Sequence, residues 1–193
     1  MSKKKDAIVQ TAQVLFANKG YGQTSMAELS FLTGAAEGTI FYHFKNKEEI
    51  FIFILTSIKD RIIQSIEKSL SGQKFQSGCD MLQWVVSFYL NLVGDMKDEL
   101  LILHRHTPYE MAQRNPACRE LLETTYNQFW GLFEKALVMG QSDGSIVVSS
   151  PRKTAMVLYA MVDGIARFDT YRIYDAGSLY NELMHICRLQ CVK

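Results

Sequence analysis

Proline is scarce in this sequence, with three residues among 193. Proline breaks helix interiors, so its scarcity permits long helices. Stretches in which apolar and polar residues alternate, the pattern of half-buried strands, are also few. The longest strand-like stretch is SIVVS, residues 145–149. These absences predict an all-α fold.

Long apolar runs are absent as well. The most apolar window, residues 81–93, is too short to span a bilayer, and the N-terminal stretch MSKKKDAIVQ has no apolar segment of signal-peptide length. The mean hydropathy is near zero. We therefore expect a cytoplasmic globular protein without a membrane partner.

Cysteine is limited to four residues, and none of them forms a C-x-x-C pair. We therefore expect neither a zinc finger nor a disulfide framework. Cys187 and Cys191 are four residues apart and would share a helix face, which leaves a redox or metal role open. The alternative is that the cysteines are small buried hydrophobic residues.

The net charge is only +1, but it is unevenly distributed. Residues 1–47 carry six lysines and three acidic residues, which gives +3, whereas the remainder carries −2. A small basic region on a slightly acidic body suits a polyanionic partner for that region alone.

Helix signals are dense in the first fifty residues. Apolar residues recur with the helical period over residues 5–19, and Lys19-Gly20 is typical of a helix end. Ser25 and Glu28 form a capping box that begins a second helix, which Gly34 ends. A third segment covers residues 37–44. Three short helices with a sharp turn indicate a helix-turn-helix unit.

A long fourth helix begins at Asn46 and continues until the stretch SGQKFQSG, residues 71–78. The residues beyond it predict a second helical region. Its expected helices cover residues 81–93, 98–107 ending at Pro108, 116–139 ending before Gly140, 151–171, and 178–191 capped by Ser178.

The stretch AAEGTIFYHFKNKEEI, residues 35–50, has the features of a DNA-recognition helix. Ile40 and Phe44 are four residues apart and would face the interior. Gly38 permits close approach to a duplex. Thr39, Tyr42 and His43 can donate hydrogen bonds to phosphate oxygens, and Lys47 would lie in the first turn of the fourth helix, where an anion is favoured. The alternative is that the aromatic residues form a small core.

Residues 7–51 resemble the DNA-binding head of the tetracycline-repressor (TetR) family of bacterial regulators, through the ordered motifs K-G-Y, T-S-M, G-T-I-F-Y-H-F and K-N-K-E. The resemblance implies a DNA-binding domain at residues 1–47 and an effector-binding and dimerisation domain at 48–193. It also implies a homodimer that represses transcription at a palindromic operator and is released by a small effector. The positions implied to contact DNA are Thr24 or Ser25, Gly38, Thr39, Phe41, Tyr42, His43 and Lys47.

Two positions depart from the family pattern. Ala36 stands where a serine or threonine cap is common, so we expect the recognition helix to be less firmly ordered without DNA. Glu37 follows, and its carboxylate faces a polyanion. We interpret Glu37 as a residue that accepts a hydrogen bond from a cytosine amino group.

The body holds sixteen of the 22 aromatic residues. The resemblance places several of them on two helices that enclose the effector, so we expect an apolar or aromatic ligand. In the stretch LHRHTPYE, His104 and Arg105 are expected to hold a polar group of that ligand. The aromatic and aliphatic residues expected to line the pocket are Trp84, Phe88, Tyr89, Leu92, Tyr126, Phe129, Trp130 and Phe133.

Other pairs carry weaker signals. His106 and Glu110 have metal-ligand spacing, but Pro108 is expected to interrupt the helix between them, so no metal or cofactor is predicted. Asp163 and Arg167 have the spacing of an internal ion pair, and Gly164 between them is explained by close approach of another helix, as at a dimer interface.

Two competing functions remain. A helical enzyme could use His104 and His106 as acid and base, but no nucleophile and base stand at motif spacing and no cofactor loop is present, so we expect no enzyme. A helical ligand-binding or adaptor protein whose head no longer binds DNA is compatible with Ala36 and Glu37. Salt dependence of DNA binding distinguishes a regulator from an adaptor.

Overall fold

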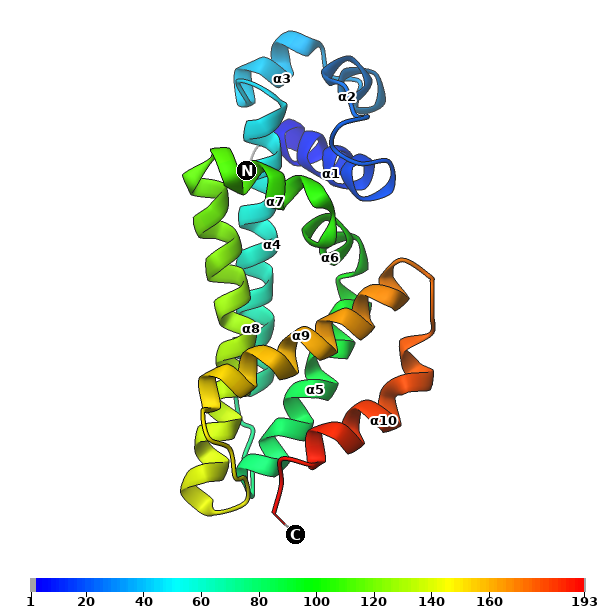
Figure 1. The fold of residues 1–193 in the computed structure, drawn as a ribbon. Coiled ribbons are helices and arrows are strands. Elements are labelled where there is room, and N and C mark those ends of the chain that lie inside the picture. The colour runs from blue at the N-terminus through cyan, green and yellow to red at the C-terminus, as the bar shows by residue number, and fades with distance from the viewer. Residues whose placement is uncertain (1–2, 193) are drawn as a thin grey trace. The chain divides into compact units, whose positions relative to one another are not determined.

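The computed structural model describes residues 3–192, and over this range all regular structure is helical, which confirms the predicted fold class. Figure 1 shows the chain from the blue N-terminal helix to the red C-terminal helix. The helices are α1 (Lys3–Asn18), α2 (Met26–Thr33), α3 (Glu37–His43), α4 (Lys47–Leu70), α5 (Gly78–Asp95), α6 (Lys97–His104), α7 (His106–Arg114), α8 (Pro116–Asp143), α9 (Pro151–Thr170) and α10 (Ala176–Arg188).

The chain forms two compact units. The first comprises Met1–Ile62 with Asp98–Glu123, and the second comprises Ile63–Lys97 with Thr124–Lys193. Of the three division points, two fall inside α4 and α8, which each contribute residues to both units, and the third follows Lys97, the first residue of α6. The predicted boundary between the DNA-binding and effector-binding domains, after residue 47, differs from this division into compact units and stays a prediction.

In the first unit, α1, α2 and α3 pack against one another as a helix-turn-helix head (Figure 1). Its core includes Ile8, Phe16 and Leu29, all fully buried. The predicted cap at Ser25 is confirmed, since its hydroxyl accepts the amide hydrogen of Glu28 at 3.1 Å. Gly34 ends α2 with a φ of 65°, a conformation in which glycine is favoured over residues with a side chain.

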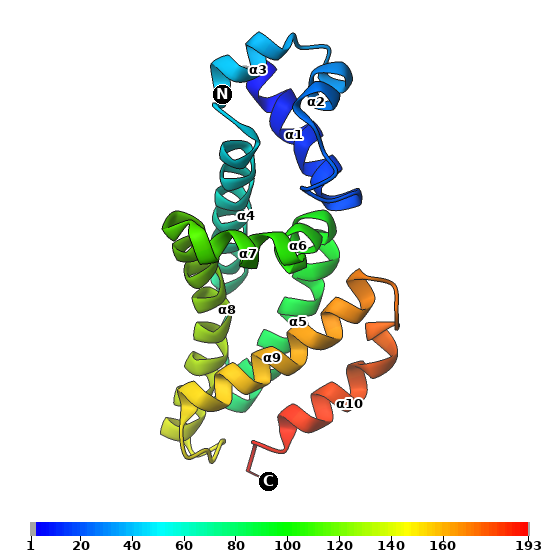
Figure 2. The same ribbon diagram turned by 45° about the horizontal axis from the view of Figure 1, so that its top comes forward.

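In the second unit, α9 and α10 lie side by side and both pack on α5 (Figure 2). The start of α5 lies close to α8, because a Cβ atom built on Gly78 would clash with the backbone of Gly140. Gly140 in turn leaves room for the side chain of Ile146. These two glycines therefore allow a close approach of two helices.

Several predicted helix ends are wrong. The prediction that α8 ends before Gly140 fails because this glycine is a packing residue inside the helix, and the left-handed residue at the end is Gly144, with a φ of 77°. Pro108 does not end a helix: it lies in the first turn of α7, where amide groups have no intrahelical acceptor in any case. The last helix is capped by Asp175, not Ser178.

The expectation of no disulfide is also wrong. Cys79 and Cys191 are bonded, although 112 residues separate them in sequence. Cys187 is a buried free thiol, so the pair considered from its spacing does not form. Within residues 3–192, no helix is long and apolar enough to cross a membrane.

Candidate functional site

Helix α3, which the sequence predicts to be the recognition helix, exposes aromatic side chains on its outer face. Tyr42 is 83% exposed and Phe41 is 48% exposed, whereas Ile40 and Phe44 are buried as predicted. The rings of Tyr42 and His43 meet edge to face, with centroids 5.0 Å apart. The alternative of a small aromatic core therefore applies to Phe44 and not to Phe41 or Tyr42.

The start of α3 has the weak cap that the sequence predicts. Ala36 makes no side-chain cap hydrogen bond. Glu37 and Gly38 are exposed in the first turn, and Thr39 is half-buried. The preceding turn is held from α2 instead, because the Ser30 hydroxyl donates to the carbonyl oxygen of Ala35 at 2.7 Å.

Of the two residues expected at the start of α2, only Ser25 is exposed. The Thr24 side chain is buried, and its hydroxyl donates to the carbonyl oxygen of Gly20 at 3.0 Å. The carboxylate of Glu28 pairs with the ammonium group of Lys19 at 2.5 Å. Ser25 is thus the member of the pair whose side chain reaches the surface.

Lys47 lies at the start of α4, but its ammonium group points into the head. It donates to the carbonyl oxygens of Tyr21 and Thr24, both at 2.7 Å, and lies 4.3 Å from the centroid of the Tyr21 ring. Partial burial lowers the pKa of Lys47. Its contact with DNA stays a prediction, and the structure adds a role in holding the loop between α1 and α2.

Two further lysines line a hollow of about 360 Å³ in the head, next to the start of α3. Lys3 and Lys4 on α1 line it together with Ala36 and Thr39. In the sequence, these lysines signal only the net charge of the N-terminal region. Their place beside α3 depends on how α1 packs, which no motif of the sequence encodes.

Arg105, expected to hold the effector, contacts the head within the first unit. One guanidinium nitrogen donates to the carbonyl oxygens of Ala17 and Asn18, at 2.6 and 3.1 Å. These carbonyls belong to the last turn of α1, where a cation is favoured. His104 is buried on the last turn of α6.

The predicted effector residues of the second unit form two groups of contacts. Tyr89, Phe129 and Tyr159 pack together, with ring centroids 5.0 to 5.5 Å apart. Trp84 and Phe88 stack on each other at 5.1 Å. The remaining members are Leu92 and Phe133, which are buried, and Tyr126 and Trp130, which are half-buried.

Asp163 is a buried carboxylate at the edge of this aromatic group. It accepts hydrogen bonds from the hydroxyl of Tyr89 at 2.5 Å and from the guanidinium of Arg167 at 2.8 Å, so the predicted ion pair is confirmed. Burial, followed by the neighbouring Tyr159 and Asp163, raises the pKa of Tyr89 well above its ordinary value. Tyr89 therefore stays a neutral hydrogen-bond donor.

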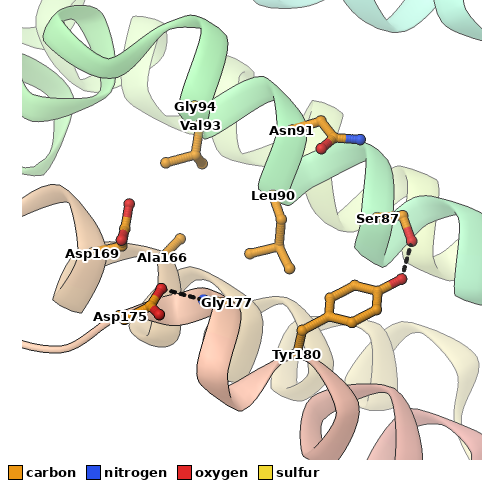
Figure 3. Close-up of a pocket in the computed structure, with 10 residues that line it drawn as sticks. All are labelled: Ser87, Leu90, Asn91, Val93, Gly94, Ala166, Asp169, Asp175, Gly177 and Tyr180. Carbon is orange, nitrogen blue, oxygen red and sulfur yellow. Dashed lines mark hydrogen bonds between the residues drawn. The ribbon is translucent and has the colours of Figure 1, made fainter.

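A cavity of about 540 Å³ lies between α5, α9 and α10 (Figure 3). Leu90 and Val93 of α5 supply apolar lining, and Asp169 at the end of α9 supplies a carboxylate. The hydroxyls of Ser87 and Tyr180 are 2.9 Å apart and join the two walls at one end. None of the predicted effector residues lines this cavity.

The outer faces of α9 and α10 expose apolar side chains. On α9 these include Val157, 69% exposed, and Phe168, and on α10 they include Leu179 and Ile186. Gly164 lies in the same stretch of α9, and a Cβ atom built on it would meet nothing within 4 Å. Among the residues that the structure describes, the close helix approach expected at Gly164 is therefore not made.

The pair His106 and Glu110 lies on one helix after all, because α7 continues through Pro108. Their side chains are 3.6 Å apart and largely exposed. In the part of the chain that the structure describes, no group of three or more His, Cys, Asp or Glu side chains is placed to hold a metal ion.

Comparison with known proteins places the head in a family. Residues 8–53 match the family described as "Bacterial regulatory proteins, tetR family". The fatty acid metabolism regulator protein of Bacillus subtilis (strain 168) is 24% identical over 139 residues, which are 72% of this chain and 69% of that protein.

Two solved structures share the fold over nearly the whole chain. A transcriptional regulator from Saccharomonospora viridis in complex with choline superposes with a TM-score of 0.81 at 20% identity, covering 100% of both chains. The regulator FadR from Bacillus subtilis in complex with stearoyl-CoA has a TM-score of 0.71 at 21% identity, covering 94% of this chain and 96% of that chain.

Proposed function

Because the chain belongs to the TetR family of bacterial transcriptional regulators, we propose that it is a ligand-responsive repressor that binds a palindromic operator as a homodimer. The observation that carries this proposal is the outer face of α3. Phe41 and Tyr42 are exposed there, although aromatic side chains usually avoid water, while Ile40 and Phe44 anchor the helix in the head.

On the DNA, α3 enters the major groove and presents Glu37, Gly38 and Thr39 to the duplex. Tyr42 and His43 donate to phosphate oxygens, and the exposed Ser25 does so from α2. Lys3 and Lys4, which share a hollow with Thr39, add two cations to the phosphate contacts. Lys47 contributes positive charge and holds the loop before α2.

The homodimer forms through α9 and α10. An apolar stripe on two neighbouring helices is unusual on a protein that works as a monomer. Val157 and Phe168 would be buried against the second copy, and Gly164 would permit the two α9 helices to approach closely. The two-fold symmetry then matches an inverted repeat in the operator.

The effector is an apolar or aromatic molecule that binds among the aromatic residues of α5 and α8. Those rings fill much of the space between them, so binding would require them to separate. The cavity at Leu90 and Val93 is a second candidate, because its volume suits a small ligand. Its carboxylates, Asp169 and Asp175, favour a ligand with a positively charged group.

Arg105 links the junction of α6 and α7 to the head within the first unit. It follows α6 and holds the last carbonyls of α1, so a displacement of α6 or α7 would pull on the head. This role replaces direct contact of the Arg105 guanidinium with the ligand, and the contact of His104 with the effector stays a prediction. The ligand then acts by favouring one of two head positions.

The test is selection from a random duplex DNA library with purified, ligand-stripped protein. Enrichment of an inverted repeat, with affinity that falls steeply with salt, supports the repressor and supplies its operator. Absence of any enriched sequence at low salt would instead favour the adaptor protein. The selected operator then serves to screen ligands by release.

A further inference from the structure

The disulfide between Cys79 and Cys191 joins two distant parts of the second unit. Cys79 lies in the first turn of α5, and Cys191 follows the end of α10, with Cα atoms 5.8 Å apart. Both residues are half-buried. Cys118 and Cys187 are buried, and burial raises their pKa to about 11, so these two stay as inert thiols at neutral pH.

Hydrogen bonds also hold the C-terminal segment in place, including one from Nε of Arg188, at the end of α10, to Oε1 of Gln83 on α5 at 2.8 Å. The amide of Val192 donates to the carbonyl oxygen of Ser145 at 2.9 Å, and the amide of Val147 donates to that of Gln190 at 3.3 Å. The segment that follows α8 is also tied to α5, because the hydroxyl of its residue Ser145 accepts the amide hydrogen of Cys79 at 3.2 Å. The disulfide is the covalent member of this junction, and reduction leaves the two backbone hydrogen bonds and the side-chain hydrogen bond between Arg188 and Gln83.

The restrained helix, α10, contributes to two features of the second unit. Tyr180, in the first half of α10, lines the cavity, and its hydroxyl is hydrogen-bonded to that of Ser87 on α5. Its outer face carries Leu179 and Ile186, which belong to the exposed apolar stripe. A bond that limits the motion of α10 therefore affects both the cavity wall and that surface.

We propose that Cys79 and Cys191 form a reversible oxidation site whose co-reactant is a low-molecular-weight disulfide, and that oxidation holds the C-terminal end of α10 against α5. If α10 contributes to the dimer interface, a restraint on its apolar face would also affect dimerisation, and this consequence alone rests on the proposed function. The oxidation chemistry and the restraint on α10 stand independently of it.

The reaction balances as two thiol–disulfide exchanges. The thiolate of one cysteine attacks a sulfur of the small disulfide, forms a mixed disulfide and releases one small thiolate. The thiolate of the second cysteine then attacks the protein sulfur and releases the other. The protein loses two electrons and two protons, and the small disulfide is reduced to two thiols.

The first experiment uses the full chain in glutathione buffers of decreasing ratio of reduced to oxidised form. After alkylation under native conditions, peptide mapping should show both cysteines labelled in reduced protein and a Cys79–Cys191 cross-link in oxidised protein. Cys118 and Cys187 should stay unlabelled in both. A cross-link that never forms, that resists millimolar reduced glutathione, or that joins Cys187 overturns the proposal.

The second experiment measures thermal unfolding and hydrogen exchange in both redox states. Reduction should lower the melting temperature by about 5–15 °C, as expected for loss of a bond that closes a long loop in a chain of this size. Amide protection in residues 176–192 should fall, while residues 3–43 stay unchanged. Equal melting and exchange in the two states would overturn the restraint on α10.

Variants separate the pair from the other thiols. Cys79→Ser and Cys191→Ser should each melt like reduced wild type and stop responding to oxidised glutathione. Cys118→Ala, which removes a thiol outside the pair, should keep the oxidant-dependent shift. An oxidant response that persists in Cys191→Ser would contradict the assignment. None of these measurements uses DNA. Their outcome therefore tests the redox proposal even if the protein fails to bind an operator.

Discussion

The ammonium group of Lys47 donates hydrogen bonds of 2.7 Å to the carbonyl oxygens of both Tyr21 and Thr24. The first residue of α4 is thereby tied to the loop between α1 and α2, more than twenty residues earlier. A side chain that the sequence predicts to contact phosphate therefore also holds a loop of the head in place.

We expect Lys47→Ala to lower the free energy of unfolding by about 1–2 kcal/mol, since carbonyls of the loop lose a charged donor and the site is only partly exposed. Urea unfolding followed by circular dichroism measures this change. Lys45→Ala, at an exposed position nearby, is the matched control and should change stability by less than about 0.5 kcal/mol. Equal effects of the two substitutions would show that the Lys47 hydrogen bonds do not stabilise the head.

Glu37 is exposed in the first turn of α3, where base edges are within reach of a recognition helix. We expect Glu37→Gln to relax the preference at one base pair in each half-site, because an amide both donates and accepts hydrogen bonds whereas a carboxylate only accepts. Parallel selections with the wild type and the variant give the comparison. Identical selected motifs would mean that Glu37 reads no base.

Tyr89 donates to the buried carboxylate of Asp163, so removal of its hydroxyl leaves a buried charge with one partner fewer. We expect Tyr89→Phe to destabilise the second unit by about 1–3 kcal/mol. Tyr159→Phe is the control, because the Tyr159 hydroxyl is 3.4 Å from the same carboxylate and should matter less. Chemical denaturation of both variants measures the two losses of unfolding free energy. A larger loss for Tyr159→Phe than for Tyr89→Phe would contradict the prediction.

Gly164 leaves open space on the apolar face of α9. If that face is the dimer interface, Gly164→Arg places a charge and a long side chain in the seam, and the dissociation constant of the dimer should rise by about tenfold or more, equivalent to 1.4 kcal/mol. Analytical ultracentrifugation over a concentration series measures it. Gly131→Arg, at an exposed glycine of α8 with equally open space, should leave the association unchanged. A dimer that tolerates Gly164→Arg would place the interface elsewhere.

The head was largely predictable from sequence because its signals are local. A cap at Ser25, a left-handed Gly34 and the four-residue spacing of Ile40 and Phe44 each depend on neighbours within one or two helical turns. The internal role of Lys47 was not predictable in this way, since its acceptors are backbone carbonyls of another loop. Side-chain periodicity carries no information about such acceptors.

By itself, the sequence determined the helical class, the order of the head helices and the side of α3 that faces outward, because periodicity and capping act over a few residues. Only the tertiary structure decided the Cys79–Cys191 bond, the approach of Gly78 to Gly140 and the cavity between α5, α9 and α10. Each of these joins segments that are far apart in the chain. Their meeting depends on how whole helices pack, which no local pattern specifies.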